Sequence, residues 1–124
     1  MTKEELKKQV EETMAQLLAT TKKSVVFSWG ITKAFAILLD GNATLALHVS
    51  ARLFEGLVLI SYCEAGDYYI IHLVNDEGTR LLKSDVMFDE MGMVIDHAIE
   101  SGDDAEEYSK FCEEEYKKLL LGQW

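Results

Sequence analysis

Proline is missing from this sequence of 124 residues, and its eight glycines are scattered. Stretches rich in proline or glycine usually mark the connections between domains, so nothing here indicates a linker. A chain of this length suits one domain, in which folding buries roughly two-thirds of the surface that the unfolded chain exposes. We therefore predict a single domain spanning residues 1–124.

Cysteine and long apolar runs are also scarce. The two cysteines, Cys63 and Cys112, do not make a disulfide framework and are expected to be reduced thiols. No apolar run is long enough to cross a bilayer. The N-terminal segment 1–14 carries charges where a signal peptide has its apolar core. We expect a cytoplasmic protein that does not bind membranes.

Positive charge is scarce as well, because 12 Lys and Arg stand against 22 Asp and Glu, for a net charge of −10. The imbalance is concentrated in residues 85–115, where twelve acidic residues and the single base Lys110 give −11. Direct nucleic-acid binding is disfavoured, since its affinity comes from Lys and Arg on phosphates. A basic protein surface would be attracted to this segment. The same charge also fits the simpler role of keeping a small protein soluble.

Sequence motifs that carry chemistry are missing too. The chain has no HExxH, CxxC, EF-hand, phosphate-binding or dinucleotide-binding pattern, and no serine in a nucleophile elbow. Glu100 lies at helical spacing from both His97 (i, i+3) and Asp96 (i, i+4), but an exposed helix face explains this arrangement without a metal ion. We therefore expect no cofactor, no metal site and no catalytic residue.

Helical signals occur at both ends of the chain. Thr2 and Glu5 form a capping box, and the helix that follows ends near Lys22 and Lys23. Its apolar residues recur at helical spacing: Leu6, Val10, Met14, Leu17 and Leu18.

Two helices are predicted near the C-terminus. The first has an apolar face of Phe88, Met91, Val94, Ile95, Ala98 and Ile99. Its opposite face carries Asp89, Asp96, His97 and Glu100. The second follows Gly102 and has a stripe of Ala105, Tyr108, Cys112, Tyr116 and Leu119.

Strand patterns fill the middle of the chain. Alternating or continuous apolar stretches occupy residues 24–30, 34–40, 43–53, 56–64 and 68–74, and a short segment at 79–85 leads into the next helix. We prefer a three-residue loop at 40–42, because it places Phe35 and Ile37 on the same face as Leu47 and Leu45. The fold class is therefore α+β: an N-terminal helix, an antiparallel meander of about five strands, and two C-terminal helices packed on the sheet.

The hairpin of residues 56–74 raises the question of a site. A two-residue turn at Gly66-Asp67 makes Cys63 and His72 diagonal neighbours, but a packed cysteine and a hydrogen-bonded histidine explain them better than a catalytic dyad. If His48 shares their face, a pocket would be lined by His48, Ser61, Cys63, Tyr68 and His72. This face is too apolar to be freely solvated. It should be covered by the remaining helix, by a second subunit or by a ligand.

Several short pieces carry a resemblance. They are "FSWG" (27–30), "LFEG" (53–56), "LISY" (59–62), "DYY" (67–69) and "VMFDEMGMVID" (86–96). On these pieces the chain resembles a group of small uncharacterised proteins of gut Bacteroidetes and their mobile elements. The resemblance implies a compact sheet flanked by helices in a bacterial cytoplasm, and it transfers no catalytic residue.

Two functions are compatible with these patterns. The leading hypothesis is a non-enzymatic interaction protein that presents acidic helices to a partner with a basic surface. A homodimer is one form that this hypothesis allows. Its contact residues would be Asp89, Asp96, Glu100, Asp103 and Asp104. The alternative is a small-molecule-binding protein or minor enzyme with a pocket on the sheet face near His48, Ser61 and His72.

Overall fold

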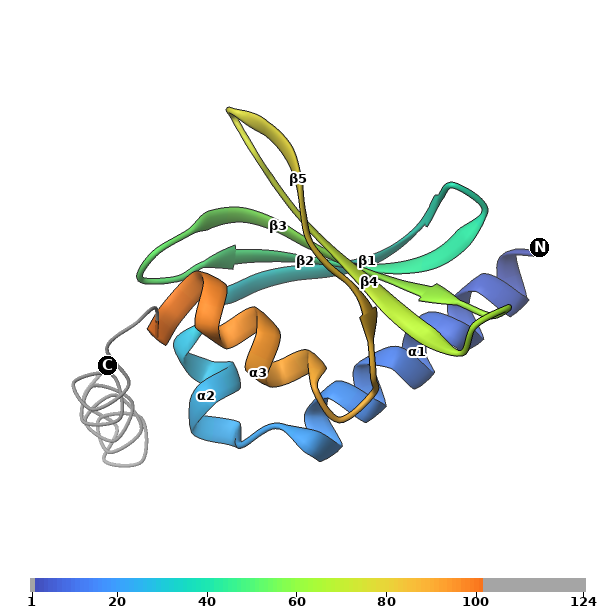
Figure 1. The fold of residues 1–124 in the computed structure, drawn as a ribbon, viewed down its shortest axis with the longest axis horizontal. Helices are drawn as coiled ribbons and strands as arrows, with labels where there is room; N and C mark the ends of the chain where they lie inside the picture. Colours follow the sequence, from blue (N-terminus) through green and yellow to red (C-terminus); the bar gives the residue numbers. More distant parts are fainter. Residues whose placement is uncertain (1, 102–124) are drawn as a thin grey trace.

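The protein is an α+β domain with a five-stranded antiparallel meander, seen in a computed structural model that describes residues 2–101 (Figure 1). The strand order is the order of the chain, from β1 to β5. The elements are α1 (Lys3–Thr20), α2 (Lys23–Ser28), β1 (Ile31–Leu39), β2 (Asn42–Ser50), β3 (Glu55–Cys63), β4 (Tyr68–Asn75), β5 (Gly78–Val86), α3 (Met91–Asp96) and the π-helical turn η1 (His97–Ser101).

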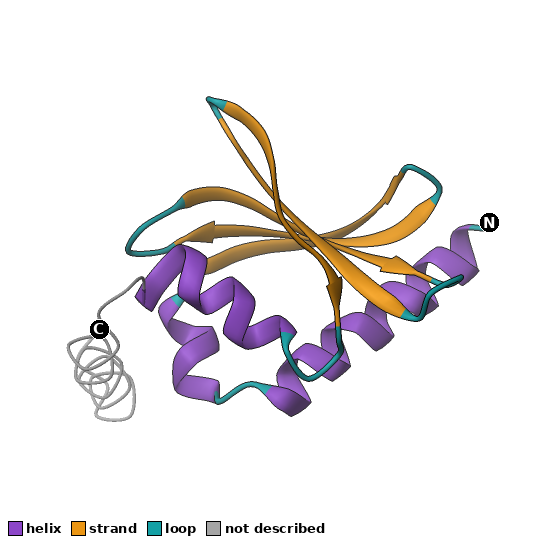
Figure 2. Cartoon of the chain, in the orientation of Figure 1, coloured by secondary structure: helices purple, strands orange, loops and turns teal. Residues whose placement is uncertain are grey.

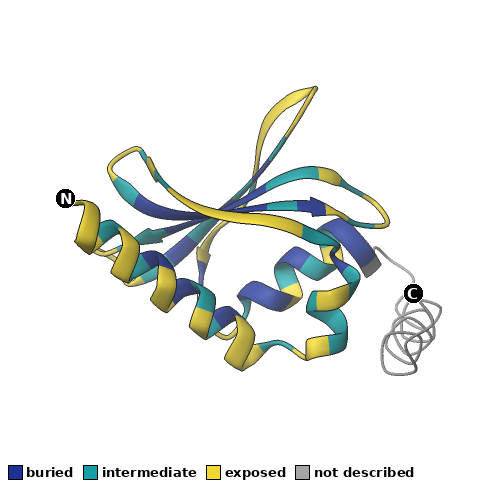
Figure 3. Cartoon of the chain, turned by 180° about the vertical axis from the view of Figure 1, so that it is seen from behind, coloured by how far each residue is buried: buried dark blue, intermediate teal, exposed yellow. Residues whose placement is uncertain are grey.

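All the described helices lie on one side of the sheet, which leaves its other face without a helix from residues 2–101 (Figure 2). The core fills the space between the two layers, and buried residues line the facing sides of α1, α3 and the central strands (Figure 3). The central strands contribute Leu45, Leu47, Val49, Val58, Ile60, Ile71 and Leu73. No helix within the described part of the chain is long and apolar enough to cross a membrane.

The start of α1 is capped as the sequence predicts. The Thr2 hydroxyl accepts a hydrogen bond from the Glu5 backbone N–H at 3.2 Å, and it donates to the Glu5 carboxylate at 3.1 Å. The first of these bonds satisfies one of the backbone N–H groups that lack partners in the first turn of a helix. One stripe of the helix, including Val10 and Leu17, packs against the sheet and places α1 along it.

The first predicted strand is wrong, because residues 24–30 begin in the short helix α2. The N–H groups of Val25 and Val26 both donate to the Lys22 carbonyl, and Gly30 then leaves the helix with φ 62°. Glycine adopts this left-handed conformation readily, which is why it often follows the last turn of a helix. Trp29 is fully buried. Tertiary packing of this indole outweighs the strand propensity of the two valines.

The segment predicted as a connection at 79–85 is instead the edge strand β5. Its pairing with β4 contains irregularities between Tyr69 and His72. Most of its side chains are exposed, so it lacks the apolar alternation that marks a half-buried strand. The predicted number of five strands is therefore right. The predicted strand at 24–30 is absent from the sheet, and β5 takes its place in the count.

The turn between β1 and β2 also differs from the prediction. It has two residues, Asp40 and Gly41, with φ of 52° and 79°, and Leu39 pairs with Asn42. Positive φ at both positions is the signature of the type I′ turn, whose twist matches that of the strands it joins. The shorter loop moves the register by one residue, so Phe35 lies opposite Ala46. It therefore points to the face away from the helices.

The first of the two predicted C-terminal helices differs from the prediction on its polar face. Met91, Ile95 and Ile99 are buried as expected, but Glu100 is also buried. In the π-helical turn, residue i+5 rather than i+4 lies over residue i. Glu100 therefore comes to the side of Ile95 instead of the solvent side. The second helix predicted near the C-terminus, after Gly102, falls outside the described residues.

Candidate functional site

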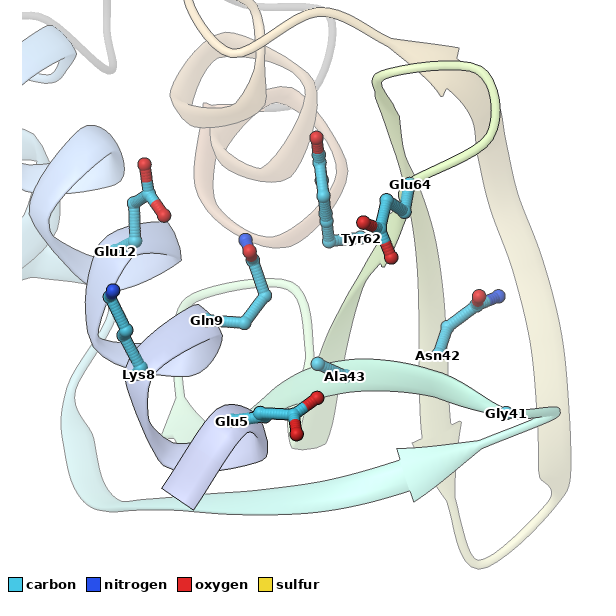
Figure 4. Close-up of a pocket in the computed structure, with 9 residues that line it drawn as sticks. All are labelled: Glu5, Lys8, Gln9, Glu12, Gly41, Asn42, Ala43, Tyr62 and Glu64. Carbon is cyan, nitrogen blue, oxygen red and sulfur yellow. The ribbon is translucent and has the colours of Figure 1, made fainter. Parts of the chain in front are cut away.

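The strongest candidate for a binding site is a polar cleft between α1 and the adjoining ends of the strands (Figure 4). Two neighbouring cavities of about 330 Å³ and 220 Å³ share Gln9, Glu12 and Tyr62 in their walls. We call the pair the α1 cleft. Its other lining residues include Glu5, Lys8, Gln16, Asn42, Glu64, Asp67 and Tyr69.

One wall of the α1 cleft is a row of polar residues on the helix. Glu5, Gln9, Glu12 and Gln16 follow one another three or four positions apart, so they share one side of α1. Val10 and Leu17, on a neighbouring side of the helix, are buried in the core. This polar row faces the end of β3 and the start of β2 across the cleft, as Figure 4 shows for Gln9 and Tyr62.

Two tyrosines form the opposite wall. Their rings lie 5.3 Å apart, Tyr62 donates a hydrogen bond to the Asp67 carboxylate at 2.8 Å, and Tyr69 donates to the side-chain oxygen of Gln16. The bond to Asp67 raises the pKa of Tyr62 to about 12. Burial raises the pKa of Tyr69. Both phenols are therefore neutral donors at physiological pH.

The charge of the cleft is one-sided. Glu5, Glu12, Glu64 and Asp67 supply four carboxylates, and Lys8 is the one base among the lining residues. These carboxylates and the half-buried ring of Tyr62 suit a positively charged group, through ion pairing and cation–π contact, whereas Tyr69 is buried. Within residues 2–101, no three side chains of the types that ligate metals are grouped to hold an ion.

The residues of the predicted sheet-face pocket do share the face away from the helices, but they do not converge. The connection between β3 and β4 has four residues rather than two, since Cys63 pairs with Tyr68 and Leu59 with His72. Cys63 and His72 are thus offset by four residues on adjacent strands, about 14 Å apart. The prediction that the two side chains are diagonal neighbours is therefore wrong, and they cannot form a catalytic dyad.

The other polar groups of this face are engaged separately. The hydroxyls of Ser61 and Thr44 lie 2.8 Å apart and are buried. His48 Nδ1 lies 2.8 Å from the Thr32 hydroxyl. His72 lies two strands away, at about 12 Å by strand spacing. The predicted histidine pair is therefore not formed.

Cys63 has a distinctive local environment at the end of β3. Hydrogen bonds from the Gly66 backbone and the Tyr68 side chain lower the pKa of its thiol. The thiol is half-buried and free. A lowered pKa favours the thiolate, but no base within the described residues is placed to make it a nucleophilic centre.

The acidic residues predicted for partner binding are separated by the structure. Asp89 is exposed. Asp96 accepts a hydrogen bond from the Trp29 indole at 2.9 Å, and Glu100 accepts one from the Arg52 backbone at 2.5 Å. Asp96 and Glu100 therefore hold elements together, and the prediction of an exposed Glu100 is wrong. Asp103 and Asp104 lie outside the described residues.

The sequence reasoning missed the α1 cleft. Tyr62 is half-buried and packs against the core at the wall of the cleft. The spacing of the polar row on α1 was a usable signal, but only the sheet topology shows what faces it. Comparison with known proteins adds no further assignment: no family model, curated protein or solved structure matches the chain.

Proposed function

We propose that this protein is a non-enzymatic binding module whose α1 cleft receives a positively charged segment of a partner protein. The observation that carries this proposal is the lining of the cleft, with four carboxylates against one lysine beside the ring of Tyr62. A lysine or arginine side chain of the partner would enter between α1 and the end of β3. The acidic balance of the whole chain supports the same class of partner.

The expected affinity is modest and depends on salt. The carboxylates of the cleft line an open surface, and exposed ion pairs contribute roughly 0.2–1 kcal/mol each. A contact between a cation and an exposed aromatic face adds about 0.5–1 kcal/mol. Several such contacts made together by one basic segment would give a binding energy that screening by salt reduces strongly.

A labelled octa-arginine peptide is a suitable probe, with its affinity measured by fluorescence anisotropy at about 50 mM and about 300 mM salt. We expect the affinity to fall steeply with salt. The double variant Glu12→Gln/Glu64→Gln should weaken binding about fivefold to tenfold at low salt. Equal affinity at the two salt concentrations would contradict the proposal.

A control variant separates the cleft from the general charge of the protein. Asp76 and Glu77 are exposed in the β4–β5 turn and do not line the cleft. Asp76→Asn/Glu77→Gln removes the same two charges, and it should leave the affinity nearly unchanged. If both double variants weaken binding equally, the acidic field rather than the α1 cleft attracts the peptide.

Further expectations from the sequence belong to the same proposal. We place the protein in the bacterial cytoplasm, as the resemblance to small Bacteroidetes proteins implies, and we keep self-association as an alternative partner mode. The exposed carboxylate of Asp89 would add to the attraction of the same basic partner, and the predicted contact residues Asp103 and Asp104 lie outside the described residues.

A further inference from the structure

The two edges of the sheet differ in how they are protected. Sheet edges carry unpaired backbone groups, and proteins usually shield them with charges, proline or irregular pairing. The edge strand β5 carries Arg80, Lys83 and Asp85, and its pairing with β4 contains two irregularities. The opposite edge strand β1 has Lys33 as its single charged residue, and its pairing with β2 is regular from there to Leu39. Of the two edges, β5 alone is therefore built to resist pairing with another strand.

The backbone of β1 has free hydrogen-bonding groups along its outer edge. Most residues of the strand are exposed, and Figure 3 shows it running beside α1. The two-residue turn makes Leu39 and Asn42 a hydrogen-bonded pair, so every second residue of β1 bonds to β2. The N–H and C=O groups of Ala34, Ala36 and Leu38 therefore point away from β2. No strand within residues 2–101 pairs with them.

An apolar groove lies between this free edge and α1. It has a volume of about 330 Å³, and its walls include Val10 and Met14 of the helix and Ala34 and Ala36 of the strand. The small alanine side chains leave room that larger side chains can fill. A strand added at this edge would form backbone hydrogen bonds with β1 and bring its own side chains into the groove.

We infer that β1 pairs with β1 of a second copy of this chain, which joins the two five-stranded meanders into one continuous sheet. The regular part of β1, from Lys33 to Leu39, has Ala36 at its centre. A twofold axis at Ala36 lets this whole stretch pair with itself in antiparallel register. The residues whose free backbone groups point outward then lie opposite one another, as hydrogen bonding requires.

The side chains of β1 complement one another in this register. Leu38, which is 51% exposed in the single chain, lies opposite Ala34 of the second copy and enters its groove beside Met14. On the other face of the sheet, Ile37 lies opposite Phe35 of the second copy. Large side chains therefore meet small ones on the side of the helices, and two apolar pairs form on the opposite side.

Charge complementarity and spacing also favour a second copy as the occupant. Lys33 lies opposite Leu39 of the second copy and therefore beside its Asp40, which allows one ion pair at each end of the pairing. α1 packs on β2 and its neighbours. The two β2 strands of the dimer lie three strand spacings apart, about 14 Å. Packed helices need roughly 8–10 Å, so the two α1 helices fit beside each other.

This surface is separate from the α1 cleft, because Val10 and Met14 face β1 whereas Gln9 and Glu12 line the cleft on the side of β3. Salt should act on the two surfaces in opposite directions. Each copy has a net charge of −10, so salt screens the repulsion between copies and maintains or strengthens the dimer. Salt weakens the binding of a basic peptide. Each proposal can therefore fail without the other.

Sedimentation velocity of the full-length protein tests the inference, at about 150 mM salt and from about 5 µM to about 500 µM protein. We expect a monomer–dimer equilibrium in this range. Leu38→Lys should weaken the dimer roughly tenfold to hundredfold, because it removes an apolar contact from each copy. Leu81→Lys is a matched control on β5: Leu81 is 55% exposed, the added charge is the same, and the dimer should remain unchanged.

A cross-link tests the register independently of how well Leu38→Lys folds. Ala36→Cys, combined with Cys63→Ser and Cys112→Ser, places two thiols across the twofold axis, where the Cα atoms of a hydrogen-bonded pair are about 5.5 Å apart. Mild oxidation should give a disulfide-linked dimer, and Leu81→Cys in the same background should stay monomeric. The inference is overturned if the parent protein is monomeric at every concentration or if Leu81→Lys weakens the dimer as much as Leu38→Lys. Equal cross-linking of the two cysteine variants would also overturn it.

Discussion

Gly92 offers the sharpest test of how the helices pack. It is the second residue of α3 and is buried against the C-terminal end of α1. A Cβ atom added at Gly92 would lie 2.0 Å from Thr21 Oγ1, 2.8 Å from its Cγ2 and 2.9 Å from its Cβ. Rotating the threonine moves the first two atoms but not the third. Gly92→Ala therefore forces the backbones of the two helices apart.

The expected magnitude follows from two opposing terms. Alanine in place of glycine in a helix normally stabilises a protein by roughly 0.5–1 kcal/mol. Overpacking in a tight contact costs about 1–3 kcal/mol. We predict that the steric term dominates and that Gly92→Ala lowers the free energy of unfolding by about 1–2 kcal/mol. For a domain of this size, that loss lowers the melting temperature by several degrees.

Urea denaturation of four proteins separates the contact from other effects. Thr21→Ala removes Oγ1 and Cγ2, and Oγ1 is a buried hydroxyl without a hydrogen-bond partner within residues 2–101. This single variant should therefore be nearly neutral. In the double variant with Gly92→Ala, the contacts with Oγ1 and Cγ2 are absent but the contact with the Cβ of residue 21 remains. Part of the lost stability should therefore return, which is a coupling of about 0.5–1 kcal/mol. A Gly92→Ala protein as stable as the parent would refute the close packing of α3 on Thr21.

Three further predictions concern single hydrogen bonds. Trp29→Phe should lower the free energy of unfolding by about 2 kcal/mol, because it removes the hydrogen-bond donor to Asp96. Asp96→Asn should lower it by less, because the asparagine side chain keeps an acceptor oxygen. Urea denaturation measures both changes. Thr2→Ala should cost about 1 kcal/mol by removing the cap of α1, and unchanged thermal unfolding would contradict the capping role. Tyr62 should ionise near pH 12 in an absorbance titration at alkaline pH, and Asp67→Asn should lower that midpoint. Because the folded pKa lies above the unfolded value of 10.0, the stabilisation is complete below pH 10 and decreases as pH rises toward 12.

Local signals in the sequence were sufficient for much of the fold. The capping box at Thr2 predicted the start of α1, and the period of two in residues 56–74 predicted which side chains share a face. Face assignment survived an error of two residues in the β3–β4 register, because an even shift keeps each side chain on its side. The one-residue error at Asp40-Gly41 did not have this protection, and it moved Phe35 to the opposite face.

The remaining features depend on contacts between distant residues. The strand propensity of Val25 and Val26 is outweighed by burial of Trp29 and by its hydrogen bond to a residue 67 positions away. Glu100 is buried because a π-helical turn brings it to the β2–β3 loop, and its carboxylate accepts from the backbone there. Nothing local to either segment specifies these partners. The α1 cleft has the same origin, since one wall comes from α1 and the other from residues 62–69, about 50 positions further along the chain.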